Sequence, residues 1–143
     1  MRIFICATSL LAAPLLAQAD TTMIDLGALP SKQVHEVATL TPLAITDGGK
    51  PSVALLDLAD GEVVPPHATQ QGIRLLTVLK GELFWGDGDE IDPAKETTYP
   101  AGSVLTVSAG DSHWLAARAG DLRLQMVLLH AEKPTPDVQA QMR

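Results

Sequence analysis

Short apolar runs separated by turn residues follow one another along most of the chain. SVALLDLA precedes Asp60 and Gly61, IRLLTVL precedes Lys80 and Gly81, and SVLTVSAG precedes Asp111. Runs of four to eight residues rich in Val, Ile, Leu and Thr, with glycine turns between them, are typical of antiparallel strands. A helical reading would need longer runs with a period of 3.6 residues. The pattern therefore predicts an all-β domain, built as an antiparallel barrel or sandwich.

The remaining apolar runs predict further strands of the same kind. They are VHEVATL (34–40), TPLAITD (41–47), ELFW (82–85), ETTYP (96–100), HWLAARAGD (113–121) and LRLQMVLLH (122–130). Alternate residues of a strand share a face. Leu124, Met126, Leu128 and His130 are therefore expected to face the interior together.

The N-terminus has the pattern of a secretory signal peptide. Arg2 is followed by the apolar run IFICATSLLAAPLLAQA, which is short for a membrane span and ends in small residues at 17 and 19. An uncleaved membrane anchor is the alternative, which Pro14 and the Ala-Gln-Ala sequence disfavour. We therefore expect residues 1–19 to be removed, and the mature protein to be periplasmic or secreted, with no membrane contact of its own. Cys6, the only cysteine, would leave with this segment.

One domain accounts for the rest of the chain. We expect a polar leader at 20–30, a barrel at 31–133 and a polar, proline-bearing tail at 134–143. The formal net charge is −7. A chain with this acidic balance is not expected to bind nucleic acid or an anionic membrane surface.

Candidate chemistry gathers around PPHATQQGIR at residues 65–74. If an extended strand leads into IRLLTVL, then His67, Thr69 and Gln71 share one face. Gly72 can bulge, so strand alternation does not place Arg74. His113 follows the turn SAGDS much later in the chain. His35, in VHEV, is most simply a surface or edge-strand residue.

Two glycine-histidine spacings resemble the cupin superfamily. Five residues separate Gly61 from His67, and Gly81 follows; a second motif runs from Gly102 through Ser108-Ala-Gly110 to His113. The resemblance covers nearly the whole mature chain. It implies a small antiparallel β-barrel, the double-stranded β-helix or jelly roll, with a site inside it. It also implies pairing of barrels, so we expect a homodimer.

A metal-binding cupin uses two histidines and a glutamate from the first motif and one histidine from the second. The corresponding residues here are His67, Thr69, Arg74 and His113, so two ligands remain and the carboxylate has become a cation. At an effective dielectric of 20, like unit charges about 4 Å apart repel by on the order of 4 kcal/mol, and a divalent ion doubles this. Arg74 thus disfavours a tightly bound metal.

The first functional hypothesis is an exported cupin domain that binds a small anionic molecule inside the barrel. A buried arginine needs an anion, and its planar fork suits a carboxylate or phosphate. Arg74 would supply the charge, with His67, Gln71 and His113 as further polar contacts. Trp114 and Tyr99 could offer aromatic faces to the same ligand. The alternative is that Arg74 only pairs internally, for example with Glu82 or Asp57.

The second hypothesis is a metal-dependent enzyme, such as a dioxygenase, isomerase or lyase. His67, Gln71 and His113 would hold Fe, Mn, Ni or Zn, and His130 is a possible further imidazole ligand. The sequence leaves open whether the protein is an enzyme.

Overall fold

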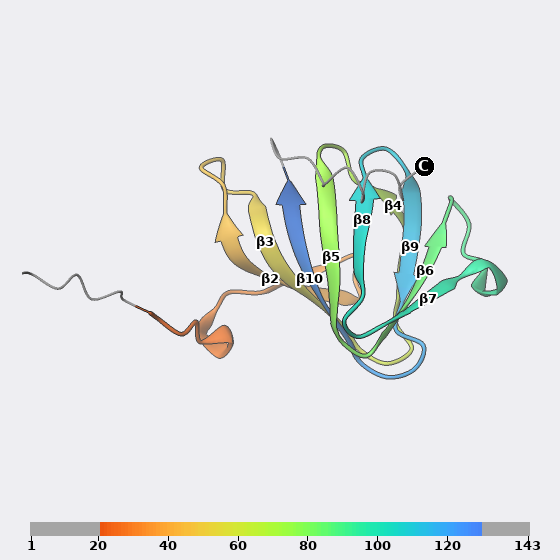
Figure 1. Ribbon diagram of the computed structural model, residues 1–143, viewed down its shortest axis with the longest axis horizontal. Helices are drawn as coiled ribbons and strands as arrows, with labels where there is room; N and C mark the ends of the chain where they lie inside the picture. Colours follow the sequence, from red (N-terminus) through yellow and green to blue (C-terminus); the bar gives the residue numbers. More distant parts are fainter. Residues whose placement is uncertain (1–20, 130–143) are drawn as a thin grey trace, which may run out of the picture.

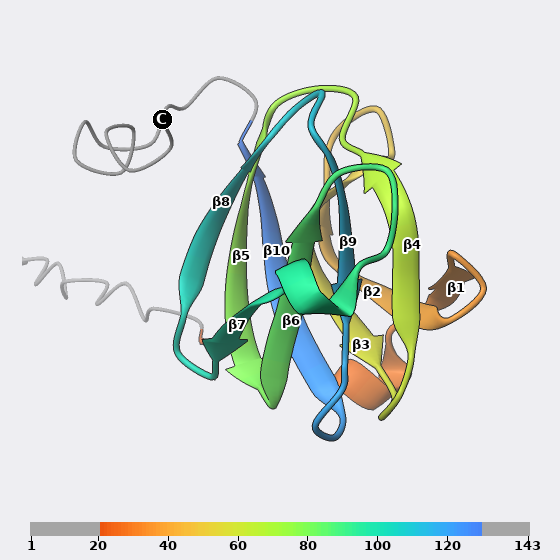
Figure 2. The ribbon, with the colours of Figure 1, turned by 90° about the vertical axis from the view of Figure 1, so that its right-hand side faces the viewer.

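Two antiparallel sheets face each other in the computed structural model, which describes residues 21–129 (Figures 1 and 2). The strand order is β1-β2-β3-β10-β5-β8 in one sheet and β4-β9-β6-β7 in the other. The strands are β1 (Lys32–Val34), β2 (Ala38–Ile45), β3 (Pro51–Leu58), β4 (Val63–Ala68), β5 (Ile73–Lys80), β6 (Glu82–Asp87), β7 (Thr97–Pro100), β8 (Val104–Ser108), β9 (Ser112–Ala116) and β10 (Leu122–Leu129). Two short 3-10 helices, η1 (Leu26–Ala28) and η2 (Pro93–Lys95), complete the elements.

This architecture confirms the predicted all-β fold. None of the helices among residues 21–129 is long and apolar enough to span a membrane. The predicted signal peptide, the tail and His130 lie outside the described residues. They stay predictions.

The core lies between the two sheets and is made by alternate residues of their strands. Its buried members include Leu56, Leu76, Val78, Leu83, Leu115, Leu122 and Leu124. The alternation predicted for the last strand is correct, because Leu124 is buried in this cluster and Met126 packs against it. Aliphatic burial between two sheets thus supplies the hydrophobic stabilisation of a domain without disulfides.

The predicted strand VHEVATL is not continuous. His35 and Glu36 have φ angles of 51° and 66°, a left-handed conformation that ends β1 and starts a turn. The chain then re-enters the sheet as β2, with Ala38 opposite Val34. This turn contains no glycine, so the apolar pattern predicted one continuous strand instead of two strands joined by a turn.

The stretch PPHATQQGIR is also divided, between two sheets rather than along one strand. His67 belongs to β4, an edge strand that pairs only with β9 and shifts register between Val64 and His67. Two prolines fit there because an edge strand leaves half of its backbone groups unpaired. The chain then turns at Gly72, with φ 77°, and starts β5 in the opposite sheet. The expected single strand through His67, Thr69 and Gln71 is therefore wrong.

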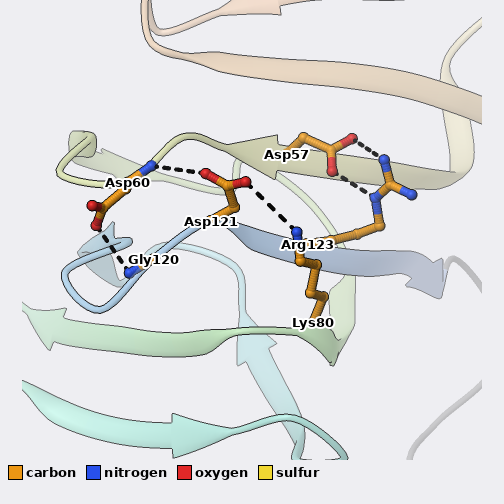
Figure 3. A network of polar contacts seen from close by, with 6 residues as sticks. All are labelled: Asp57, Asp60, Lys80, Gly120, Asp121 and Arg123. Carbon is orange, nitrogen blue, oxygen red and sulfur yellow. Dashed lines mark hydrogen bonds and ion pairs between the residues drawn. The ribbon is translucent and has the colours of Figure 1, made fainter.

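A polar network ties together the turns at the end of the barrel where β5 finishes (Figure 3). The Asp60 carboxylate accepts a hydrogen bond from the Gly120 amide at 2.9 Å. Asp121 accepts one from the Asp60 amide at 3.3 Å and lies 3.6 Å from the Lys80 ammonium. Gly81 has φ 81°, and a Cβ there would collide with the Asp121 carbonyl. The cavity described below reaches the opposite end of the barrel, where β5 begins next to Arg74.

Candidate functional site

A cavity of about 250 Å³ lies between the two sheets. Most of its wall is aliphatic. Its polar lining residues are Lys32, His35, Ser52, His67, Arg74 and His113. We call His35, His67, Arg74 and His113 the polar end of the cavity.

Strand register orders the rest of the wall below the polar end. Arg74 stands near the start of β5, and Leu76, the next residue on the same face, lies opposite Met126. Met126 belongs to β10, and Leu124, two residues before it on the same face of that strand, lies opposite Leu56 on β3. All four of these apolar residues line the cavity. We call them the apolar end; a ligand reaching it leaves water for an aliphatic surface.

Arg74 is half-buried and has no acidic partner within residues 21–129. The predicted alternative of a pair with Asp57 is wrong. That carboxylate accepts from the Arg123 guanidinium at 2.6 and 3.2 Å on the adjoining strand (Figure 3). Glu82 forms no ion pair with Arg74 either, over the same residues. Burial lowers the pKa of Arg74, which is the mark of a cation without compensation.

His67 and His113 face each other across β4 and β9, as the resemblance implied for two site histidines. They are directly paired in register, and their ring centroids are 4.5 Å apart. The Nδ1 atom of His67 lies 3.0 Å from the Pro65 carbonyl oxygen, and Nδ1 of His113 lies 3.0 Å from that of Asp111. Carbonyl oxygens only accept, so both Nδ1 atoms carry the proton and donate. The His67 ring is thereby held by its own strand, and the His113 ring by the turn that precedes β9.

Two aromatic rings that the sequence did not assign to the site extend this pair. The His35 ring centroid is 4.5 Å from that of His67, so this exposed residue faces the cavity rather than solvent alone. The Trp85 ring stacks on His113 at 4.4 Å and 17°. Trp85 belongs to β6, and its indole N–H donates to Asp87 at 2.8 Å. Neither contact has a sequence signal, because each joins segments that are distant along the chain.

The site disfavours positive charge on His113 and on His35. Burial is the main cause that lowers the pKa of His113, and the nearby His67 and Arg74 lower it further. The bond to the Asp111 carbonyl and the charge of Asp87 act in the opposite direction. Burial, His67 and Arg74 lower the pKa of His35 in the same way. His113 is therefore neutral at pH 7.

Three predicted ligand contacts do not reach the cavity. Gln71 lies exposed in the bend after β4, because the strand ends at Ala68. Trp114 is buried on the other face of β9, where its indole N–H donates to Glu96 at 2.9 Å. Tyr99 packs against the core from β7 and is not among the lining residues. Strand alternation and strand ends account for all three.

The residues present do not fit a divalent metal. Within residues 21–129, no group of three or more His, Cys, Asp or Glu side chains is arranged to hold one. Gln71 is too far out to serve as the predicted third donor. The Thr69 hydroxyl, which takes the place of a family histidine, is buried without a hydrogen-bond partner among residues 21–129 and is not on the cavity wall. The remaining donors are imidazoles beside a guanidinium, which repels a cation.

Solved structures provide the relatives of this fold. The chain is similar to a cupin superfamily protein from Desulfitobacterium hafniense, with 26% identity over 68% of this chain and 83% of that one, at a TM-score of 0.51. It is also similar to a predicted oxalate decarboxylase from Thermotoga maritima, with 16% identity over 76% of this chain and 100% of that one, at 0.59.

Hydroxypropylphosphonic acid epoxidase from S. wedmorenis shares 22% identity over 76% of this chain and 59% of its own length, at a TM-score of 0.61. That enzyme has also been solved with Fe(II). No protein-family model and no curated protein sequence matches the chain. The likenesses show that the chain has a cupin fold; the fold by itself does not name a function.

Proposed function

We propose that this cupin-fold barrel binds a small anionic molecule, whose charged group pairs with Arg74 while the rest of the molecule occupies the apolar end. One observation carries the proposal: Arg74 faces a cavity and lacks an acidic partner within residues 21–129. An arginine that served only the fold would be paired, because an uncompensated buried charge is costly. A ligand carboxylate or phosphate supplies the missing anion bidentately.

Calorimetric titration with 3-methylbutanoate and with inorganic phosphate tests this proposal. Arg74→Met should weaken binding by about 2–5 kcal/mol, the usual cost of deleting one partner of a desolvated charge pair. Arg123→Met is the matched control, because it removes the same charge from the outer face, where Arg123 pairs with Asp57. Equal losses in the two variants would mean that only net charge matters, and the proposal would fail.

Stability separates a binding role from a structural one. Arg74→Met removes a half-buried cation without a described partner, so the free energy of unfolding should stay constant or rise by about 1 kcal/mol. If urea denaturation instead shows a loss of several kcal/mol with no change in anion affinity, Arg74 is an internal ion-pair residue.

A metal-dependent enzyme is the competing function, and the likeness to an epoxidase that has been solved with Fe(II) supports it. Elemental analysis of protein purified without chelator tests it. Stoichiometric iron, manganese, nickel or zinc that is lost in His67→Ala and His113→Ala would refute our proposal and support the metal-dependent enzyme. Arg74→Glu would restore the carboxylate of the family motif. We expect this variant to gain affinity for Zn²⁺ or Ni²⁺ and to lose affinity for the anions.

A further inference from the structure

The polar end presents one strong donor and two acceptors to a ligand. Both imidazoles use their Nδ1–H on backbone carbonyls, at 3.0 Å in each case. In a neutral ring the other nitrogen, Nε2, then carries a lone pair and accepts. No group within residues 21–129 donates to Nε2 of His67 or of His113. Both rings line the cavity, so these acceptors are available to whatever occupies it.

For His113, burial and the neighbouring His67 and Arg74 favour this neutral, accepting form. His35 and Lys32 from the β1 hairpin and Arg74 from β5 also line the cavity. In the described part of the chain, Asp87 on β6 is the one carboxylate that acts on His113, and its Oδ1 already accepts from the Trp85 indole. A proton on Nε2 of His113 would add a positive charge to a ring whose centroid is 4.5 Å from that of His67, near a guanidinium.

A simple anion does not satisfy this arrangement. Its oxygens would suit Arg74 but would meet lone pairs on the imidazoles. The complementary group carries a carboxylate for Arg74 and an O–H that donates to Nε2. An ammonium group could also donate, but it would lie beside Arg74 and Lys32 in a cavity that no carboxylate of residues 21–129 lines. Below these groups the wall is aliphatic, formed by Leu56, Leu76, Leu124 and Met126.

We propose that the ligand is a hydroxy carboxylate with a short apolar chain. Its carboxylate pairs with Arg74, its hydroxyl donates to Nε2 of His67 or His113, and its chain lies against the apolar end. This inference rests on the proposed function, since it assumes that Arg74 holds an anion in the cavity. It adds the identity of the second polar group and its role as a donor.

Three probes of the same shape test the inference by calorimetry at pH 8: 2-hydroxy-3-methylbutanoate, 3-methylbutanoate and valine. The hydroxy acid should bind about five- to tenfold more tightly than the plain acid, as one added hydrogen bond allows. Valine should bind more weakly than either. In the double variant His67→Phe with His113→Phe, the two acids should bind equally, while Arg74→Met should weaken both.

The tautomer can be measured without any substitution. Nitrogen-15 spectra of the histidine rings at pH 8 should show protonated Nδ1 and unprotonated Nε2 for His67 and His113. This readout keeps the inference testable if the double variant does not fold. The opposite tautomer would overturn it.

The remaining outcomes separate the two proposals. If both acids bind through Arg74 with equal affinity, or if the plain acid takes up a proton as it binds, the imidazoles are not hydroxyl acceptors. The hydroxy-acid inference then fails while anion binding stands. If neither acid binds, or if Arg74→Met changes nothing, the proposed function fails and takes this inference with it.

Discussion

Glu96 joins the loop after β6 to the strand that carries His113, and replacing it should lower the free energy of unfolding. Its side chain is 2% exposed and accepts from three donors. Arg118 donates twice at 2.6 Å, and the Trp114 indole donates once at 2.9 Å. Trp114 is the neighbour of His113 on β9, so this cluster supports the strand on the face that points away from the cavity.

The magnitude follows from what each donor loses in Glu96→Ala. Removing one partner of a buried ion pair costs about 3–5 kcal/mol. The Arg118 side chain is 30% exposed and can partly rehydrate, so we take about 2 kcal/mol for it. The buried indole N–H loses its acceptor, which costs about 1–3 kcal/mol. Together these predict a loss near 4 kcal/mol, a large share of the ~5–15 kcal/mol typical of a domain.

Urea denaturation followed by tryptophan fluorescence measures this loss. Asp57→Ala is the control, because it breaks an equally short carboxylate–guanidinium pair whose side chains are 34% and 43% exposed. The control should lose no more than about 1 kcal/mol. Similar losses in the two variants would refute the reasoning, since burial is the property that distinguishes the pairs.

The pH dependence of the same variant gives an independent check. Hydrogen bonds from Arg118 are the main cause that holds the pKa of Glu96 below its ordinary value, against the opposing effect of burial. The stability that ionised Glu96 contributes is therefore complete above pH 4.5 and is lost as the pH falls through the folded-state pKa. Glu96→Gln should have a shallower decline in stability between pH 5 and pH 3 than the wild type. Parallel curves would contradict this account.

Three further predictions concern the fold, the site and assembly. Gly81→Ala should destabilise the protein more than Gly102→Ala by about 1–3 kcal/mol in urea. Both glycines have positive φ, but only at Gly81 would a Cβ meet backbone, and equal losses would contradict this. Between pH 7 and pH 5, the wild type should lose stability as the pH falls, because the unfolded His113 protonates below pH 6.5 before the folded one does. His113→Gln should reduce that slope, with the remainder due to His35, and an unchanged slope would show that His113 is not the source. Size-exclusion chromatography with light scattering should give the mass of a homodimer, and a monomer at micromolar concentration would refute the expected pairing.

The sequence determined the fold class and two of the site histidines. Short apolar runs of four to eight residues separated by glycine turns favour a sheet protein, because a strand can end and turn within a few residues whereas a helix needs a longer run. The cupin resemblance, carried by the spacing around Gly61 and Gly102, implied that His67 and His113 meet, and they are direct partners in register. Arg74 was also placed near them, although its face was left open by the turn at Gly72.

Only the tertiary structure decided which residues share the cavity with them. Strand alternation predicted that Gln71 shares a face with His67. However, β4 ends at Ala68, and the Gln71 side chain is exposed. The His35 ring reaches His67 from the turn after β1, and the Trp85 ring stacks on His113 from β6 without lining the cavity; neither has a local sequence signal. The physical reason is that alternation is a property of one strand, whereas a cavity wall depends on strand ends, turn conformation and register between strands distant in the chain. The sequence also could not show that Arg74 has no acidic partner within residues 21–129, because this depends on where each carboxylate lies in the folded chain.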